Sequence, residues 1–424
     1  MMDITFSGGG IDGTISAPAS KSCTHRAIIM AALSRGRCVI TNPLDSLDTR
    51  ATADAMITMG ASIDWADDRI CIESKEIHAP NRIVDVLNSG TTMRLMTGIA
   101  ALFDSETTIV GDDSVMKRPM EPLLNALKGC GVRCESNDGK APIRIRGPVE
   151  GNRICIDGST SSQFISSVLM MSPLVGRPMD IILEGDIVSQ PYIDITTDMM
   201  ERFGIYIIRT DSGFHVEPQS YVPCDYVVPS DFSSAAYPLV AGGLSGRASV
   251  KGLDMSDQQG DKKIVDILRM AGCSVDIDGD VITCTHNGRP KACDIDISNV
   301  PDLFPIVAVL LCTADGKSKL HGAPQLHFKE SDRIESVSDM LNTLGADIRP
   351  TDDGCIIEGV EHLRGEWVDH KGDHRLMMAA SIASLVSDGP ISMKDDRCWD
   401  VSYPRFIEHM RSLGMRCRHV HDGQ

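Results

Sequence analysis

The most regular feature of the chain is an apolar, helix-like segment followed by a glycine and a short strand-like segment. This pattern occurs six times, for example in AMITMGASIDW and MMERFGIYIIRT. The glycines are separated by 71, 73, 68, 73 and 69 residues, and they are Gly60, Gly131, Gly204, Gly272, Gly345 and Gly414. Because glycine readily adopts the left-handed conformation that ends a helix, each junction predicts a helix followed by a strand. The near-constant spacing predicts six units of about 70 residues that fill the chain.

The apolar segments also indicate how these units pack. FISSVLMMSPL and DLFPIVAVLLC are apolar on nearly all sides, so we expect both helices to be buried on most faces. Units that place their helices inside and their sheets outside, three to a globule, would explain this burial. We expect the boundary between the third and fourth units near VVPSDFSSAA, where Pro229 and Ser230 precede a new helix.

Composition and charge exclude several classes of function. The net charge of -18 argues against a nucleic-acid or anionic-membrane surface, because such binding needs a basic footprint. None of the 14 cysteines lies at C-x-x-C spacing, which removes the common zinc and thioredoxin signatures. The start, MMDITFSGGG, lacks the pattern of a signal peptide, and the longest apolar runs are shorter than the roughly 18 residues of a membrane helix. We therefore expect a soluble, cytoplasmic protein.

Hydroxyl and basic side chains gather where helices are expected to begin. In GSTSSQF (158–164), one hydroxyl is enough to cap the following helix, and a surplus of donors is also how a helix start binds phosphate. Lys21, in PASKSCTHRAII, opposes the helix dipole unless an anion binds there. Lys329 and Arg333, in HFKESDRIESV, also fit one face of a salt-bridged surface helix. Each segment has an ordinary structural explanation, but together they are suited to binding phosphate or carboxylate groups.

Seven short motifs resemble one known family. They are K-S-x-x-x-R at 21–26, N-S-G-T-T-M-R at 88–94, K-R-P-M at 117–120, G-S-T-S-S-Q-F at 158–164, S-Q-P-Y-I-D-I-T at 189–196, K-E-S-D-R at 329–333 and D-H-R at 373–375. In order and spacing they closely resemble the 5-enolpyruvylshikimate-3-phosphate synthase family over essentially the full chain. The resemblance implies an α/β fold, the two-domain inside-out α/β barrel, with six βαβαββ repeats, three per domain, joined by a hinge.

The resemblance also implies that each domain lies on the side of one substrate. Residues 21–229 would form the N-terminal-type domain on the shikimate 3-phosphate side. Residues 1–20 with 230–424 would form the C-terminal-type domain on the phosphoenolpyruvate side. We expect no cofactor and no metal, because side chains supply the cations and the sequence shows no ligand cluster. A monomer is expected, because two halves of one chain already build the site.

The implied reaction transfers the enolpyruvyl group of phosphoenolpyruvate to the 5-hydroxyl of shikimate 3-phosphate and releases phosphate, in the pathway to aromatic amino acids. By resemblance, Asp302 lies at the 5-hydroxyl, Glu330 is the acid/base that faces the methylene, and Lys21 neutralises charge. The residues implied to bind shikimate 3-phosphate are Lys21, Ser22, Arg26, Ser161, Ser162, Gln163, Ser189, Tyr192, Asp302, Gln325 and Lys329. Those implied to bind phosphoenolpyruvate are Lys21, Asn88, Gly90, Arg118, Gln163, Lys329, Arg333, His374 and Arg375.

The sequence departs from the family pattern in three places. Val401 stands where members commonly carry Lys, so one phosphoenolpyruvate contact is missing or is supplied by another residue. Gln190 and Gln325 stand where some members have Lys and Asn, and both keep the capacity to form hydrogen bonds. Gly90 and the S-S-Q order match the glyphosate-sensitive class, so we expect glyphosate to compete with phosphoenolpyruvate.

Three alternatives remain at this point. The UDP-N-acetylglucosamine enolpyruvyl transferase shares the fold, but it is expected to show K-N at the first motif and a cysteine in the loop here written GDDSVMKRPM. The RNA 3'-phosphate cyclase is expected to have a basic face, which the net charge of -18 opposes. A non-catalytic phosphometabolite-binding homologue has Val401 in its favour, and the presence of Asp302 and Glu330 against it.

Overall fold

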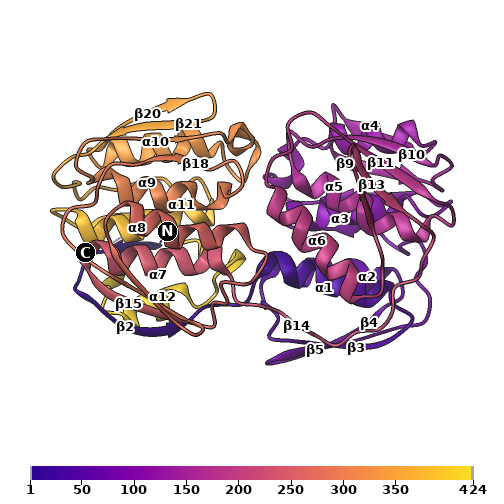
Figure 1. Ribbon diagram of the computed structural model, residues 1–424, viewed down its shortest axis with the longest axis horizontal. Helices are drawn as coiled ribbons and strands as arrows, with labels where there is room; N and C mark the ends of the chain where they lie inside the picture. Colours follow the sequence, from indigo (N-terminus) through magenta and orange to yellow (C-terminus); the bar gives the residue numbers. More distant parts are fainter. Residues whose placement is uncertain (1, 422–424) are drawn as a thin grey trace. The chain divides into compact units, whose positions relative to one another are not determined.

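The computed structural model describes residues 2–421, and the chain divides into two compact units. The N-terminal unit is Ala19–Val228, and the C-terminal unit combines Met1–Pro18 with Pro229–Gln424. These bounds lie within two residues of the boundaries predicted from the sequence, which follow residues 20 and 229. Both units mix helices and strands throughout (Figure 1).

Each unit contains six α-helices among the described residues. Those of the N-terminal unit are α1 (Lys21–Leu33), α2 (Leu47–Thr58), α3 (Gly90–Ala100), α4 (Glu121–Gly129), α5 (Ser162–Met171) and α6 (Gln190–Arg202). Those of the C-terminal unit are α7 (Phe232–Ser245), α8 (Ile264–Met270), α9 (Phe304–Cys312), α10 (Arg333–Thr343), α11 (His374–Ala383) and α12 (Phe406–Ser412).

The strands of the N-terminal unit form three four-stranded sheets. In sheet order they are β14 (Tyr226–Val227), β3 (Gly36–Thr41), β5 (Arg69–Ser74) and β4 (Ser62–Ala66); β6 (Val84–Asp85), β7 (Thr107–Val110), β9 (Lys140–Arg146) and β8 (Arg133–Asn137); and β10 (Arg153–Asp157), β11 (Met179–Glu184), β13 (Gly213–Val216) and β12 (Ile208–Thr210). In each sheet the first two strands are parallel and the other neighbouring pairs are antiparallel.

The strands of the C-terminal unit form two four-stranded sheets and one three-stranded sheet. In sheet order they are β16 (Ser274–Asp278), β17 (Val281–Thr285), β15 (Gly246–Lys251) and β2 (Ile11–Ser16); β18 (Asp294–Asp296), β19 (Lys317–His321), β21 (Gly354–Glu358) and β20 (Asp347–Thr351); and β22 (Ile391–Lys394), β1 (Met2–Phe6) and β23 (Cys417–His421). Strand β2 runs parallel to β15, while β1 lies antiparallel to both β22 and β23. The start of the chain therefore belongs to two sheets of the C-terminal unit (Figure 1).

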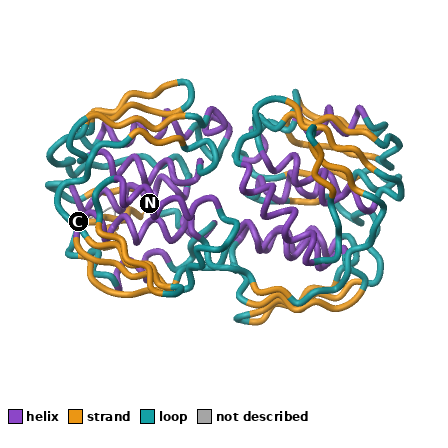
Figure 2. The backbone as a smooth tube through the Cα atoms, in the orientation of Figure 1, coloured by secondary structure: helices purple, strands orange, loops and turns teal. Residues whose placement is uncertain are grey.

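Within each unit the helices gather in the interior and the sheets lie outside them (Figure 2). Helix α9 is buried along its whole length, and α5 is buried at every position except Gln163. This burial agrees with the prediction from the two apolar segments. A helix with no solvent-facing side must place its polar side chains near its ends or pair them with neighbouring helices.

All six glycine junctions are confirmed. Their φ values lie between 81° and 107°, in the left-handed region, for Gly60, Gly131, Gly204, Gly272, Gly345 and Gly414. Each glycine lies two residues beyond the end of a helix, and the next strand follows within a few residues. Glycine avoids the steric cost of a Cβ in this conformation, which explains why the same residue type recurs at every junction.

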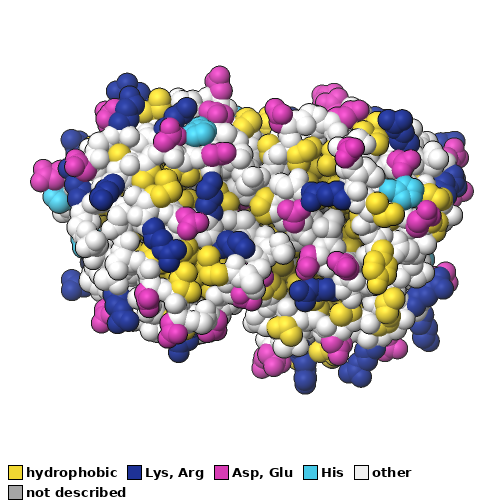
Figure 3. Space-filling view, viewed as in Figure 1, with side chains coloured by type: hydrophobic (Ala, Val, Ile, Leu, Met, Phe, Trp, Pro, Cys, Tyr) yellow, Lys and Arg dark blue, Asp and Glu magenta, His cyan; other side chains and the backbone are white. Residues whose placement is uncertain are grey.

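In the described residues no helix is both long and apolar enough to cross a membrane. On the face drawn in Figure 3, acidic and basic side chains are interspersed, and no continuous basic area appears there. The charge distribution on this face therefore offers no footprint of the kind that a nucleic acid needs.

Helices α3 and α5 approach closely through a glycine. The Gly98 N–H donates to Ser167 Oγ at 3.1 Å, and this hydroxyl donates to the Arg94 carbonyl oxygen at 2.7 Å. A Cβ placed on Gly98 would lie only 2.7 Å from the backbone oxygen of Ser167. The close approach holds the start of α3 beside the start of α5.

We therefore predict that Gly98→Ala lowers the free energy of unfolding by about 1–3 kcal/mol, because the helices must separate to admit the methyl group. The control is Gly129→Ala at the end of α4, where a Cβ meets no atom within 4 Å. That change should leave stability unchanged or raise it by up to about 1 kcal/mol, because alanine favours helix. Guanidinium titrations of the two variants measure the difference, and equal stabilities would contradict the packing argument.

Candidate active site

The C-terminal unit contains a buried arginine surrounded by three carboxylates. Arg333, the first residue of α10, has a side chain only 1% exposed. Its Nη1 donates to Asp302 Oδ1 at 2.8 Å, its Nη2 to Glu330 Oε2 at 2.7 Å and its Nε to Asp373 Oδ2 at 2.9 Å. Burial alone would lower the pKa of Arg333, but the charges of Asp373, Glu330 and Asp302 outweigh it and raise the pKa. The guanidinium is therefore permanently charged and fixed in orientation.

Asp302 connects this arginine to a second one. Its other oxygen, Oδ2, accepts a hydrogen bond from Arg375 Nη2 at 2.9 Å. Burial would raise the pKa of Asp302, but the charges of Arg375, Lys329 and Arg333 together hold it well below its usual range. Asp302 is therefore a carboxylate at any pH near neutrality, and its side chain remains 19% exposed.

The other predicted binding residues of the C-terminal unit lie near Arg333 or Arg375 in the sequence. Asp373 caps α11 by accepting the Arg375 N–H at 2.9 Å, and His374 is buried at the first position of the same helix. Helix α10 begins at Arg333, so Lys329 precedes the helix, and the surface-helix alternative for this segment is wrong. Gln325 donates to the Ser298 carbonyl oxygen at 3.0 Å.

In the N-terminal unit, Lys21 is paired with a carboxylate. Lys21 is the first residue of α1, Ser20 caps that helix, and Lys21 Nζ lies 3.1 Å from Asp48 Oδ2 in α2. The two side chains are 15% and 5% exposed. The unfavourable position of a lysine at a helix start is thus offset by a buried partner, which a sequence argument from the dipole alone did not include.

The opening of α5 is joined to the opening of α3. Gln163 Nε2 donates to Thr91 Oγ1 at 2.9 Å, and Gln163 Oε1 accepts from Arg94 Nη1 at 2.8 Å. Ser161 is the N-cap and accepts the Gln163 N–H at 3.3 Å, so the prediction that a hydroxyl of this segment caps the helix is confirmed. Ser162, the first helical residue, is buried. The capping of α5 leaves the remaining hydroxyls of this segment available for another role.

Arg26 is a buried connector between three helices. Its Nε donates to Thr196 Oγ1 at 2.7 Å and its Nη2 to Ser166 Oγ at 3.2 Å, while its Nη1 and Nη2 also donate to the backbone oxygens of Ser22 and Tyr192. The side chain is about 1% exposed. These contacts hold the starts of α1 and α6 together, so Arg26 positions Ser22 and Tyr192.

Gly90 and Arg118 lie in direct contact. Gly90 is the first residue of α3, and a Cβ there would overlap Arg118 Nη1 and lie 3.2 Å from Arg118 Cζ. Arg118 is 6% exposed and sits in an extended conformation before Pro119. Asn88 donates its side-chain amide to Asp112 Oδ2 at 2.6 Å. The absence of a side chain at Gly90 therefore sets where this guanidinium lies.

Ser189 is held in a conformation that costs energy. Its φ of 56° and ψ of 41° are left-handed, it precedes α6 directly, and it makes no side-chain capping bond. A non-glycine residue in this region costs roughly 1–3 kcal/mol, and such residues cluster at binding sites. Tyr192 lies in the first turn of the helix that follows. Apart from Arg118, the predicted residues of this unit thus lie at or near the starts of α1, α3, α5 and α6.

Comparisons with known proteins identify the family of this chain. The family model for EPSP synthase (3-phosphoshikimate 1-carboxyvinyltransferase) matches residues 7–410. The chain belongs to the EPSP synthase family. A protein of Methanocorpusculum labreanum named 3-phosphoshikimate 1-carboxyvinyltransferase is 42% identical over 421 residues, which cover 98% of this chain and 100% of that protein. A protein of the same name from Methanocaldococcus jannaschii is 39% identical over 412 residues, covering 95% of this chain and 96% of its own.

Solved structures of an EPSP synthase and of another enolpyruvyl transferase share the fold. An EPSP synthase from Acinetobacter baumannii matches with a TM-score of 0.81 and 26% identity, covering 99% of this chain and 100% of that one. An enolpyruvyl transferase from Streptomyces tendae matches with a TM-score of 0.79 at 16% identity, covering 99% and 98% of the two chains, and shows the fold alone. The predicted family and the two-domain inside-out α/β fold are thereby confirmed.

Two buried carboxyl groups of this EPSP synthase family member were missed by the sequence analysis. Asp48 holds Lys21, and Asp261 accepts a hydrogen bond from Ser233 Oγ. Burial and the nearby charge of Asp302 raise the pKa of Asp261 to about 7. No sequence motif marks either residue. Asp48 is typical of an acidic residue in the first turn of a helix, and Asp261 lies in a short turn. Arg94 and Asp373 stood inside quoted motifs but were given no role.

We predict that Asp302→Asn lowers the unfolding free energy of the C-terminal unit by about 3 kcal/mol at pH 7, because two guanidinium groups lose a charged partner. Since the ion pairs lower the pKa of Asp302, the stability they add is present above about pH 4 and is lost as the pH falls further. The difference between parent and variant should therefore shrink between pH 5 and pH 3.

Guanidinium titration followed by tryptophan fluorescence measures this difference. In a Trp65→Phe background the remaining tryptophans, Trp367 and Trp399, both lie in the C-terminal unit. Asp276→Asn, at an exposed position of β16, is the control and should change stability by less than about 0.5 kcal/mol. A difference for Asp302→Asn that stays constant with pH would contradict the ion-pair account.

Proposed function

We propose that this protein is a 3-phosphoshikimate 1-carboxyvinyltransferase. It transfers the enolpyruvyl group of phosphoenolpyruvate to the 5-hydroxyl of shikimate 3-phosphate and releases phosphate, in the shikimate pathway to aromatic amino acids. The observation that carries the proposal is the match of relatives bearing this name over nearly their whole length, at 38–42% identity. Those names favour this reaction over that of the UDP-N-acetylglucosamine enolpyruvyl transferase.

The N-terminal unit supplies most of the proposed shikimate 3-phosphate site. Lys21, Ser161, Ser162 and Ser189 would bind the phosphate, and Gln163 with Tyr192 would contact the ring. Support comes from three helix starts that carry these residues, because a helix start offers free N–H groups and a favourable dipole to an anion. Ser22 belongs to the same group, and Arg26 serves it mainly by positioning.

The proposed phosphoenolpyruvate residues are arginines held in fixed orientations. Arg333 and Arg375 in the C-terminal unit share Asp302, and Arg118 in the N-terminal unit is set against Gly90. A guanidinium fork matches the two oxygens of a carboxylate or a phosphate. The remaining members of this group are Lys21, Asn88, Gln163, Lys329 and His374.

The charge balance of the C-terminal unit suggests how Asp302 becomes a base. While Arg333 and Arg375 contact it, its low pKa makes it a weak proton acceptor. In the proposed cycle the anionic groups of phosphoenolpyruvate take hydrogen bonds from these arginines. Asp302 then loses part of its compensating charge, its pKa rises toward its ordinary value, and it can accept the proton of the 5-hydroxyl.

Glu330 is proposed to act on the methylene carbon of phosphoenolpyruvate. Glu330 takes up a proton from solvent as the anionic substrate offsets the charge of Arg333, and it donates that proton to the methylene carbon of phosphoenolpyruvate while the 5-oxygen bonds to the neighbouring carbon, which gives a tetrahedral intermediate. Return of a methyl proton and departure of phosphate then restore the double bond. The hydrogen bond from Arg333 Nη2 fixes the Glu330 carboxyl group for this role. Lys21 and Lys329 would neutralise charge on the transferring group.

Three expectations about the protein's setting stay predictions. They are a monomeric state, a cytoplasmic location and turnover without a cofactor. Val401, in the 3₁₀ turn Cys398–Val401, also leaves open which residue takes the place of the family's lysine. A weaker affinity for phosphoenolpyruvate would follow if no other residue does so.

We expect inorganic phosphate to be released only when both phosphoenolpyruvate and shikimate 3-phosphate are present. Glu330→Gln should lower kcat by about 10²-fold or more, because the proton donor is lost while its shape is kept. Binding of shikimate 3-phosphate, measured by calorimetry, should persist. Glu335→Gln, on the exposed face of the first turn of α10, is the matched control and should keep parental turnover.

Binding of shikimate 3-phosphate without phosphate release from the parent would instead favour the non-catalytic homologue. Full activity of Glu330→Gln would remove Glu330 from the mechanism while leaving the transferase assignment standing.

We also expect glyphosate to compete with phosphoenolpyruvate, and Gly90→Ala to weaken both ligands. A methyl group at Gly90 must displace the Arg118 guanidinium, so the KM for phosphoenolpyruvate and the Ki for glyphosate should each rise by about tenfold or more, the effect of losing one charged hydrogen bond. The dissociation constant of shikimate 3-phosphate should be unchanged. Gly129→Ala, at an open position, is the control. Unchanged activity of the parent under millimolar glyphosate would contradict the competition.

A further inference from the structure

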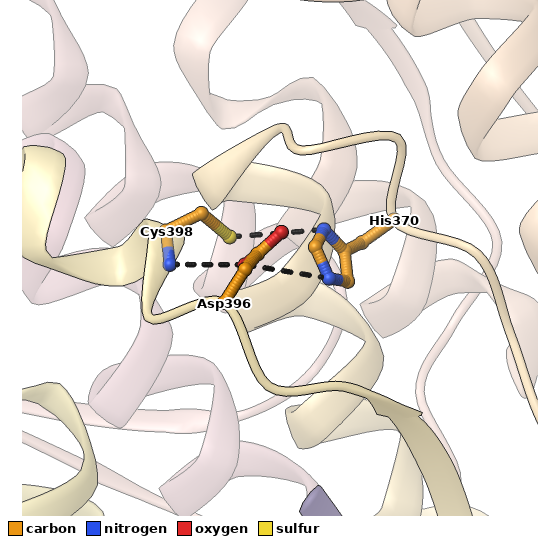
Figure 4. A group of neighbouring side chains, drawn as sticks. All are labelled: His370, Asp396 and Cys398. Atoms are coloured by element: carbon orange, nitrogen blue, oxygen red, sulfur yellow. Dashed lines mark hydrogen bonds and ion pairs between the residues drawn. The ribbon is translucent and has the colours of Figure 1, made fainter. Parts of the chain in front are cut away.

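In the described residues, one group of side chains has the composition and spacing of a metal site. It consists of His370, Asp396 and Cys398, whose ligand atoms all lie within 4.8 Å of one another. The three side chains converge in Figure 4 from two loops of the C-terminal unit, one before α11 and one after β22. The cluster differs from the prediction of no ligand cluster, because His370 lies far from the other two residues in the chain and no spacing motif joins them.

His370 is held as a metal-binding histidine is usually held. The residue is 2% exposed, and its Nε2–H donates to the Lys394 carbonyl oxygen at 3.0 Å. This bond fixes the tautomer and turns the lone pair of Nδ1 toward Cys398, whose Sγ lies 3.7 Å away. Metal-ligating histidines typically donate their second ring N–H to a carbonyl or a carboxylate in this way.

Nδ1 also accepts the N–H of Gly372 at 3.1 Å. Gly372 is exposed, so its N–H can turn to water when the lone pair is needed by an ion. The thiol of Cys398 can donate to the same nitrogen in the absence of an ion. The hydrogen bonds of this group therefore hold the ligand atoms near one another without blocking their rearrangement.

A backbone turn brings both Asp396 and Cys398 to the His370 ring, with Asp396 Oδ1 3.7 Å from Nε2 and Cys398 Sγ 3.7 Å from Nδ1. Arg397 between them is left-handed, with a φ of 55°, and the Cys398 N–H donates to Asp396 Oδ1 at 3.2 Å. The Asp396 side chain is 27% exposed, which gives an ion a route from solvent. Lys394 Nζ lies 3.9 Å from Asp396 Oδ2 and is the nearest competing cation that this carboxylate meets.

We propose that His370, Asp396 and Cys398 bind a divalent cation of the zinc class, with water in the fourth position. A thiolate, an imidazole and a carboxylate together select zinc over the hard cations magnesium and calcium, which prefer oxygen ligands. On binding, the Cys398 S–H bond breaks, the sulfur lone pair bonds to the metal, and the proton leaves to solvent. The charge of the ion replaces that proton beside Asp396.

An ion at this site would link two loops that carry residues near the proposed active site. Asp373, which holds Arg333, lies three residues after His370, and Val401 lies three residues after Cys398. A bound ion ties together the two loops that carry these residues. The proposal itself is independent of the catalytic assignment, because it is tested by binding without either substrate.

The test uses the full-length protein, treated with chelator and titrated with Co²⁺ as a coloured substitute for zinc. One equivalent of Co²⁺ should produce a thiolate-to-cobalt charge-transfer band in the near ultraviolet and the visible bands of a tetrahedral ion. Added Zn²⁺ should abolish both. The absence of a thiolate band in the parent protein would overturn the proposal.

Variants assign the ligands. Cys398→Ser should lose the charge-transfer band, while Cys155→Ser, which removes an exposed thiol of the N-terminal unit, should keep it. Asp396→Asn should weaken Co²⁺ binding by about tenfold or more. A band that survives Cys398→Ser, or an affinity that Asp396→Asn leaves unchanged, would overturn the three-ligand site.

A variant that is expected to bind Co²⁺ more tightly gives a test whose result misfolding cannot imitate. Lys394→Ala removes the competing ammonium group but keeps the backbone oxygen that orients His370. It should tighten Co²⁺ binding about two- to fivefold, because a nearby like charge repels the incoming ion. A loss of affinity in this variant would contradict the role given to Asp396.

Discussion

The structure depends on one constraint, which is that a polar group left without a partner costs free energy inside helices enclosed by other helices and by sheets. In the N-terminal unit Arg26 meets this requirement by bonding to α5 and α6, and Gln163 meets it by bonding to α3. Such bonds fix the positions of the helix starts relative to one another. The proposed binding groups lie at those starts, so the same bonds that satisfy the interior also align the groups that would face a ligand.

The C-terminal unit meets the constraint with charges rather than with neutral groups. Lys329, Arg333 and Arg375 are balanced in number by Asp302, Glu330 and Asp373, and most of this cluster is shielded from solvent. A buried cluster of this kind contributes less to stability than it does to a fixed arrangement of donors. Arg333 and Arg375 are bound to these carboxylates, and an anionic ligand would have to exchange partners with them. Affinity would then reflect a difference between two sets of ion pairs.

Much of the fold could be predicted from the sequence because the determinants are local. A left-handed glycine after a helix and an apolar segment without a polar face each act over a few residues, and all six glycine junctions and the burial of α5 and α9 followed from them. The partners of charged residues depend on contacts between distant segments. Asp48 with Lys21, and His370 with Cys398, therefore could not be predicted from spacing. Arg333 was noticed as a basic residue at an expected helix start, which is a local signal, and the family motifs then gave Arg333 and Arg375 their roles.

The first strand of the chain lies between the last two, with β1 bonded to β22 and β23. The N-terminal unit is continuous from Ala19 to Val228, so all of its residues are synthesised before most of the C-terminal unit. Strand β1 is synthesised before every other described strand, but its partners β22 and β23 are the last two described strands to follow. The C-terminal unit is thus completed only after β23 has been synthesised, and until then its first strand lacks at least one of its partners and is exposed to other chains.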